Sequence, residues 1–278
     1  MKLVLTLLVR DEADLLAENL AHHFDAGVDF VVATDNGSRD GTAEILRAYE
    51  RAGRLEYHYQ PPADFAQHAW VTRMARRAAA VHGADWVING DADEFFVPAS
   101  GTLKDVLRRL PAGVDVVLVP RRNFVPCERP RRRPPPVEMV YHAPGFIAPK
   151  AVHRGVPDVT VWQGNHGAES PRLRLPARPC PGIIAYHYPI RSLAQFETKV
   201  WNGGSGYDLN DTLHPELGHH KRRWYRLLLA GALPEEYARL FMSRDQLCAA
   251  LDAGTLQKDL TLRTRLLHLG PAAVLNGQ

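Results

Sequence analysis

The first 120 residues alternate between short apolar runs and segments with helical spacing. The run KLVLTLLV is apolar almost throughout, as expected of a strand buried on both faces. The next segment, DEADLLAENLAHHFDAG, places its apolar residues on one side of a helix. The same alternation continues through VDFVVATD, SRDGTAEILRAYERAG, RLEYHYQ, AQHAWVTRMARRAAAVHG, ADWVING, TLKDVLRRL and VDVVLVP. Strand–helix alternation predicts right-handed crossovers and an α/β fold with a mainly parallel central sheet flanked by helices.

The pattern changes after residue 120. Residues 121–139 carry six arginines and five prolines, which predicts a long exposed loop with neither a helix nor a central strand. Such a loop is either a solvated excursion or a lid beside the site. Short strands are expected in FIAPKAVHRGV, VTVWQGNHGA and GIIAYHYPI, and helices from about residue 192. We therefore predict a catalytic core over residues 1–190, including the 120–140 loop, with a helical C-terminal region over 191–278 packed on it.

Composition and charge exclude several classes of function. The chain has 45% hydrophobic and 23% charged residues, as ordinary globular proteins do. Its net charge of +3 is too small to suggest a nucleic-acid partner. The three cysteines form no CxxC pair, which indicates neither a zinc ribbon nor a disulfide framework.

The N-terminal segment MKLVLTLLVRDEADLL is too interrupted by charges for a signal peptide. No apolar run approaches the roughly 20 residues of a membrane-spanning helix. A cytoplasmic protein is expected, with a peripheral position at the inner face of the membrane left open.

The fourth predicted strand leads into the acidic segment INGDADEFF. Its three carboxylates, Asp91, Asp93 and Glu94, repel one another unless a cation lies nearby. Asp91 and Asp93 are two residues apart, so in an extended segment their side chains point the same way. Such a pair suits a divalent cation, Mn²⁺ or Mg²⁺, that also binds phosphate oxygens. The alternative is an acidic turn without a ligand.

A second motif, TDNGSRDGT, ends the second predicted strand. Asp35 stands at the strand end, before a glycine-rich turn, where it can accept hydrogen bonds from a nucleoside base or ribose. Both motifs follow strands of a parallel sheet, and such sheets bind ligands at the carboxyl ends of their strands. We expect the two motifs to share one site, with Arg10, Arg73 and Arg76 as further possible phosphate contacts.

Together these motifs resemble the family-2-type glycosyltransferases with the GT-A (nucleotide-diphospho-sugar transferase) fold. VRDEADLL is similar to their xNE-like turn, TDNGSRDGT to their DDGSxDGT motif, and INGDADEFF to their DxD motif. The DADEF form is most similar to the branch that includes family-92-like enzymes. PKAVHRGV, NHGA and HYPIRSLAQFETK resemble later motifs of that branch. The resemblance covers roughly residues 1–205.

The resemblance implies a set of site residues. Those implied for the donor are Glu12, Asp35, Asp91, Lys150, Arg154 and Lys199. Those implied for the metal are Asp91 and Asp93, with His187 or His166 as a further ligand. Asp93 and Glu94 are the implied catalytic carboxylates. The GGFDE…ED segment that supplies the base in many relatives is absent, so the base stays open. His22 and His23 lie mid-helix, and we expect them to be structural.

The implied activity is metal-dependent transfer of a sugar, with inversion, from a nucleotide-sugar donor to a hydroxyl acceptor. The resemblance favours a UDP-sugar as donor, and a carbohydrate or other hydroxyl compound as acceptor. One alternative is a nucleotidyltransferase, against which stands the lack of a glycine- and arginine-rich loop after the first strand. The other is a non-catalytic nucleotide-sugar-binding protein.

Overall fold

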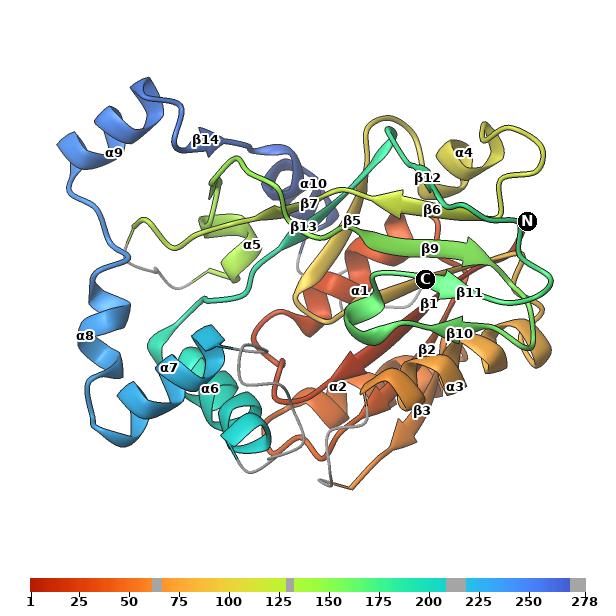
Figure 1. Ribbon diagram of the computed structural model, residues 1–278, viewed down its shortest axis with the longest axis horizontal. Helices are drawn as coiled ribbons and strands as arrows, with labels where there is room; N and C mark the ends of the chain where they lie inside the picture. The colour runs from red at the N-terminus through yellow and green to blue at the C-terminus, as the bar shows by residue number, and fades with distance from the viewer. Residues whose placement is uncertain (62–66, 129–132, 209–218, 271–278) are drawn as a thin grey trace. The chain divides into compact units, whose positions relative to one another are not determined.

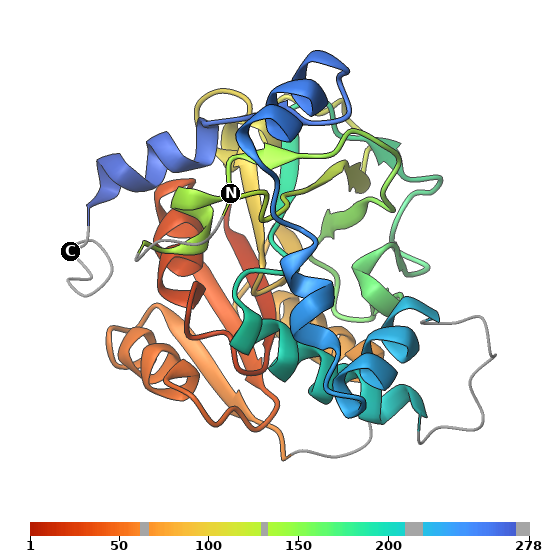
Figure 2. The same cartoon turned by 90° about the vertical axis from the view of Figure 1, so that its left-hand side faces the viewer.

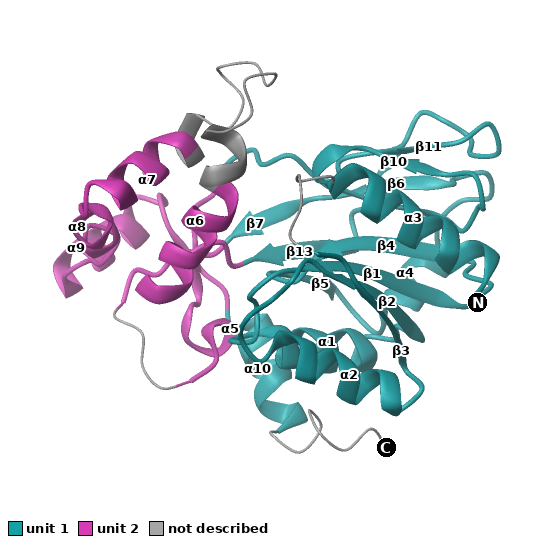
Figure 3. Cartoon of the chain, turned by 90° about the horizontal axis from the view of Figure 1, so that it is seen from below, with its two compact units in different colours: residues 1–123, 145–187, 260–278 teal, residues 124–144, 188–259 magenta. Residues whose placement is uncertain are grey.

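The computed structural model describes residues 1–61, 67–128, 133–208 and 219–270 (Figure 1). The chain divides into two compact units, shown in different colours in Figure 3. Unit 1 comprises residues 1–123, 145–187 and the chain from residue 260, and unit 2 comprises residues 124–144 and 188–259. The chain thus leaves unit 1 at residue 124 and again at residue 188, and it returns at residue 260.

Unit 1 is built on a seven-stranded sheet with the order β12–β6–β9–β4–β1–β2–β3. Its strands are β1 (Leu3–Val9), β2 (Phe30–Asp35), β3 (Leu55–Tyr59), β4 (Trp86–Asp91), β6 (Val116–Val119), β9 (Lys150–Arg154) and β12 (Arg178–Pro179). Neighbouring strands run parallel except at β9, which is antiparallel to both β4 and β6. The predicted mainly parallel sheet is confirmed.

Helices cover both faces of this sheet. The central strand β1 has apolar side chains on both faces, and each face must be covered to be buried. Leu3, Leu5 and Leu7 pack into one core with α1, α2 and α4, whereas Val4 packs into a second core with α3. Side chains alternate across a strand, so a continuous apolar run serves both cores. The helices of unit 1 are α1 (Leu16–Asp25), α2 (Thr42–Arg51), α3 (Gln67–Ala80), α4 (Leu103–Arg108) and α10 (Thr261–Leu269). Figure 2 shows the red helix α1 beside the red strand β1.

A second sheet in unit 1 has the order β5–β13–β7. Its strands are β5 (Glu94–Pro98), β13 (Ile183–His187) and β7 (Arg121–Asn123). The prediction of a loop from residue 121 is wrong over β7, which pairs in parallel with β13 at the edge of this sheet. The remaining short elements of unit 1 are β10 (Thr160–Val161), the 3₁₀ turn η1 (Gln163–Asn165) and β11 (Ala168–Glu169).

Unit 2 is mostly helical. Its elements are α5 (Pro135–Glu138), β8 (Tyr141–His142), α6 (Leu193–Asp208), α7 (His219–Leu229), α8 (Leu233–Ala238), α9 (Arg244–Asp252) and β14 (Gln257–Lys258). Its main apolar cluster includes Phe196, Val200, Leu233 and Tyr237.

The proline-rich segment holds a short helix, α5, where the sequence predicted none. Proline is tolerated in the first helical turn because the N–H groups there have no helical partner. Residues 129–132 of the predicted loop lie outside the described residues. Within the described ranges, no helix is long and apolar enough to cross a membrane.

Candidate functional site

The two sequence motifs meet at one edge of the large sheet. β1 lies between β2 and β4, and its register pairs Val9 with Asp35 on one side and Leu8 with Asp91 on the other. The three strands are parallel, so their carboxyl ends come together. The structure therefore brings Asp35 and Asp91 to the same edge, as expected, and both belong to unit 1.

The loops after β1 and β2 are tied together by hydrogen bonds. The backbone N–H of Asp11 donates to Ser38 Oγ at 2.9 Å, and Asp11 Oδ1 accepts from the N–H of Arg39 at 2.7 Å. The N–H of Glu12 donates to Thr42 Oγ1 at 3.0 Å. These contacts fix the backbone of Glu12 at the edge that carries Asp35.

The carboxylate of Asp35 is buried and holds its own loop in place. Its Oδ1 accepts from the N–H and Oγ of Ser38 at 2.9 and 2.6 Å, and its Oδ2 accepts from the Tyr57 hydroxyl at 3.0 Å. Burial raises the pKa of Tyr57, and the charge of Asp35 raises it further. Three of the roughly four acceptor positions of Asp35 are thus in use, and its side chain is 1% exposed.

The acidic segment has an internal cation, Lys150. Its Nζ lies 2.7 Å from Asp91 Oδ2 and 3.0 Å from Glu94 Oε2, and the side chain is buried. β9 runs antiparallel to β4, which brings its first residue to the carboxyl end of β4. Burial by itself lowers the pKa of Lys150, but the charges of Asp91 and Glu94 outweigh it and raise that pKa above its ordinary value. Lys150 therefore meets two carboxylates, whereas the sequence suggested a phosphate or a sugar.

Glu94 is fully buried between two cations. Its Oε1 lies 3.1 Å from Arg121 Nη1, and its Oε2 faces Lys150. Its side chain is 0% exposed, which keeps an acceptor hydroxyl away. The geometry therefore does not suit Glu94 to the catalytic role that the sequence suggested.

Asp93 faces His187, which is the last residue of the strand β13. The His187 Nε2 atom lies 3.4 Å from Asp93 Oδ2, and Nδ1 lies 2.7 Å from Asn123 Oδ1. The second sheet sets this arrangement, because its register pairs His187 with Glu94 on one side and with Asn123 on the other. With the tautomer assigned from this network, Nδ1–H donates to the amide oxygen and the Nε2 lone pair points toward the carboxylate. Two acceptors that face each other suit a cation between them.

The donor set of Asp93 and His187 fits a divalent transition metal ion. Oxygen and imidazole nitrogen together suit Mn²⁺, and the remaining positions suit water and phosphate oxygens. In the described parts of the chain, no group of three or more His, Cys, Asp or Glu side chains is arranged to hold a metal ion. A metal ion at this edge would thus have two protein ligands and would need oxygen atoms from a substrate.

Three other predicted residues have different surroundings. Arg154 lies at the far end of β9, with its guanidinium 4.4 Å from the centre of the Trp86 ring, so the structure does not bring it to the acids. His166 Nδ1 donates to the carbonyl of Pro149, the neighbour of Lys150, at 2.8 Å. Lys199 belongs to α6 in unit 2, outside the unit that holds the acids.

Four further residues contact the site, and the sequence did not predict them. Asn165 Nδ2 and Gln67 Nε2 donate to Asp91 Oδ1 at 3.3 and 3.4 Å. The other two residues belong to β7: Arg121 binds Glu94, and Asn123 binds His187. Two features of the sequence point weakly to these residues. One is the QGN turn, in which Asn165 has a positive φ of 63°. The other is the position of RRN directly after a predicted strand.

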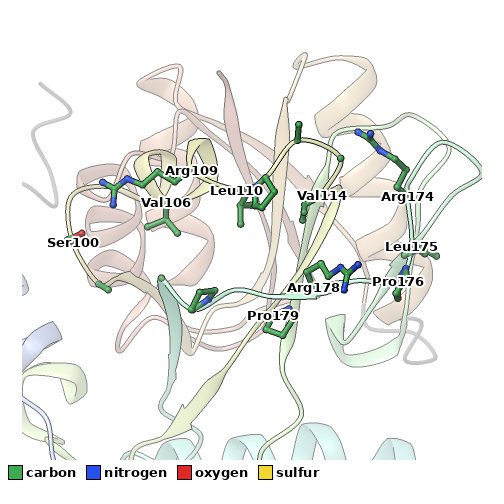
Figure 4. A pocket seen from close by; sticks show the side chains of 16 residues that line it. Ser100, Val106, Arg109, Leu110, Val114, Arg174, Leu175, Pro176, Arg178 and Pro179 are labelled. Atoms are coloured by element: carbon green, nitrogen blue, oxygen red, sulfur yellow. The ribbon is translucent and has the colours of Figure 1, made fainter.

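A separate hollow of about 810 Å³ lies beside α4, the segment before β6, and β12 (Figure 4). Ser100, Leu110, Val114 and Pro179 are among the residues that line it, and none of the predicted site residues does. Arg174 also lines it, but its guanidinium is bound to Asp115 at 2.8 and 3.1 Å. The hollow is therefore distinct from the edge that carries the acids.

Comparison with known proteins bears on the same part of the chain. Residues 6–114, which include both motifs, match the family model described as Glycosyltransferase family 92. The resemblance predicted from the sequence is confirmed over these residues. A glycosyltransferase family 92 protein of Oryza sativa subsp. japonica is 33% identical over 102 residues, which is 36% of this chain. The chain spans only 17% of the length of that relative.

Solved structures of glycosyltransferases are similar at a low level. TarS 1-349 of S. aureus in complex with UDP gives a TM-score of 0.45 at 13% identity, over 97% of this chain and 91% of that one. The mannosyltransferase PcManGT from Pyrobaculum calidifontis, in complex with GDP-Man and Mn²⁺, gives a TM-score of 0.44 at 19% identity. That likeness covers 99% of this chain and 81% of the other.

Proposed function

We propose that this chain is a glycosyltransferase that moves a sugar from a nucleotide-sugar donor, with a UDP-sugar favoured, to a hydroxyl acceptor. The observation that carries the proposal is that Asp35 and the acidic segment share one sheet edge, within the residues that match family 92. An edge of this kind, with a polar loop beside an acidic cluster, suits a nucleoside diphosphate whose charge is balanced by a cation.

In this proposal each group at the edge has a separate task. The loop held by Asp35 takes the nucleoside, and Asp93 and His187 hold the divalent cation that the donor diphosphate requires. When bound, that cation supplies positive charge to the departing diphosphate. The acceptor oxygen attacks the anomeric carbon from the opposite face, the bond to the phosphate oxygen breaks, and the acceptor proton passes to a base.

Of the two carboxylates predicted for catalysis, we keep Asp93 and set Glu94 aside. Glu94 is buried between Lys150 and Arg121 and cannot reach an acceptor. Asp93 lies beside the imidazole of His187, in the turn between β4 and β5, and its side chain is 4% exposed. A carboxylate that binds a metal ion is a weak base. In this proposal Asp93 therefore holds the cation and the donor diphosphate, and the acceptor proton passes to a group other than Asp93 or Glu94.

Ligand-dependent thermal unfolding tests the proposal. The protein is heated with nucleoside diphosphates, nucleoside triphosphates and a panel of nucleotide sugars, each with and without Mn²⁺. A ligand at about 100 times its Kd stabilises the folded protein by about 2.7 kcal/mol, so a nucleotide sugar with Mn²⁺ should raise the midpoint. Stabilisation by triphosphates alone, with pyrophosphate release, would instead identify a nucleotidyltransferase.

A further inference from the structure

The carboxylates of the acidic segment fall into two groups according to what each one faces. Asp91 and Glu94 share the ammonium group of Lys150, at 2.7 and 3.0 Å. Asp93 faces the imidazole of His187 at 3.4 Å. Three acids within four residues thus do not act as one cluster, although the sequence suggested that Asp91 and Asp93 would bind the same ion.

All four oxygens of Asp91 and Glu94 have protein donors. The ammonium group of Lys150 binds one oxygen of each carboxylate, and Arg121 Nη1 lies 3.1 Å from the second oxygen of Glu94. Asn165 and Gln67 donate to the second oxygen of Asp91 at 3.3 and 3.4 Å. A metal ion at these oxygens would have to displace such donors.

The ammonium of Lys150 is held in place. The side chain is 2% exposed, and Glu94 beside it is 0% exposed, so the ion pair lies away from solvent. An ammonium group taken out of water is stable only beside its counter-ions. A divalent ion bound to the same carboxylates would lie close to this fixed positive charge and would be repelled by it.

We propose that Lys150 is a built-in cation that occupies the Asp91–Glu94 part of the acidic segment and confines a divalent metal ion to Asp93 and His187. The assignment of Lys150 stands on the contacts above, whereas that of the metal ion rests on the proposed function.

Mn²⁺ binding followed by electron paramagnetic resonance tests the proposal without any activity assay. The wild type, Asp91→Asn and Asp93→Asn are titrated with Mn²⁺ in the presence of UDP. We expect Asp91→Asn to change the Mn²⁺ affinity by less than about twofold and Asp93→Asn to lower it by more than about tenfold, as loss of one of two protein ligands would. Equal losses in the two variants would overturn the proposal.

Lys150→Met, titrated with Mn²⁺ alone, provides the complementary test. Removing the ammonium leaves Asp91 and Glu94 without their shared cation, so this variant should bind Mn²⁺ more than about tenfold more tightly than the wild type. The gain should vanish in Lys150→Met/Asp91→Asn. A folded Lys150→Met protein with wild-type Mn²⁺ affinity would overturn the assignment of Lys150.

The variants also separate this inference from the proposed function. If wild-type protein binds no Mn²⁺ with UDP but Lys150→Met gains a site, the built-in cation stands and the metal part of the proposed function fails. If Lys150→Met does not fold, as circular dichroism would show, the comparison of Asp91→Asn with Asp93→Asn decides by itself.

Discussion

Asp35 shows how a single carboxylate can serve both the fold and a ligand. It accepts three hydrogen bonds from Ser38 and Tyr57, and it lies at the edge where a nucleoside is proposed to bind. Removing it therefore changes the loop and the ligand contact together. The two effects can be separated because each donor can be removed by itself.

We predict that Asp35→Ala weakens nucleoside diphosphate binding by about 1.5–3 kcal/mol, the scale of a hydrogen bond to a charged group. Calorimetry measures this directly. Ser38→Ala and Tyr57→Phe are the matched controls, because each removes hydrogen bonds to Asp35 but keeps the carboxylate. If the two controls weaken binding as much as Asp35→Ala does, the aspartate acts only by shaping its loop.

At the scale of elements, α1 holds the backbone of the acidic segment in place through hydrogen bonds. Asn19 Nδ2 donates to the backbone carbonyls of Ala92 and Glu94, both at 2.8 Å. His22 and His23 contact the backbone of Phe96 at 3.0 and 3.2 Å. The two histidines are thus structural in this arrangement, and α1 fixes the turn between β4 and β5.

Asn19→Ala should lower the free energy of unfolding by about 2–4 kcal/mol, because two buried carbonyls lose their donor. Urea denaturation measures the change. Glu18→Gln, on the same turn of α1, is the control and should change the free energy by less than about 1 kcal/mol. An Asn19→Ala protein as stable as the wild type would show that the turn does not depend on α1.

The elements that the sequence predicts are those with a local pattern. β1, β2 and β4 are apolar runs bounded by polar turns, and their end residues led to Asp35 and the acidic segment. β7 is different, since RRN becomes a strand only by pairing with β13. The contact of Lys150 with Asp91 likewise depends on the antiparallel register of β9, which no local pattern specifies. Long-range pairing thus accounts for what the sequence did not predict.

At the scale of the whole molecule, buried histidines make stability depend on pH. Burial lowers the pKa of His153 to about 4, against an ordinary value of 6.5. Between these two values the unfolded chain binds more protons than the folded chain, so the free energy of unfolding falls as the pH drops from 6.5 to 4. His153 by itself should account for about 3 kcal/mol at pH 4.

We therefore predict that His153→Gln flattens the fall in stability between pH 6.5 and 4, as measured by urea denaturation at several pH values. His68→Gln, at an exposed position, is the control and should leave the pH profile unchanged. A His153→Gln profile parallel to that of the wild type would show that this histidine does not stay neutral in the folded protein.

The proposed function requires that the acidic edge cleaves a nucleotide sugar. The most direct measurement is the release of nucleoside diphosphate from a panel of nucleotide sugars with Mn²⁺, followed by chromatography, for the wild type and Asp93→Asn. We predict release of UDP from a UDP-sugar by the wild type, and a rate lower by about two orders of magnitude or more in Asp93→Asn, because the leaving diphosphate loses its cation. Release at the same rate by both proteins, or no release from any nucleotide sugar, would contradict the account.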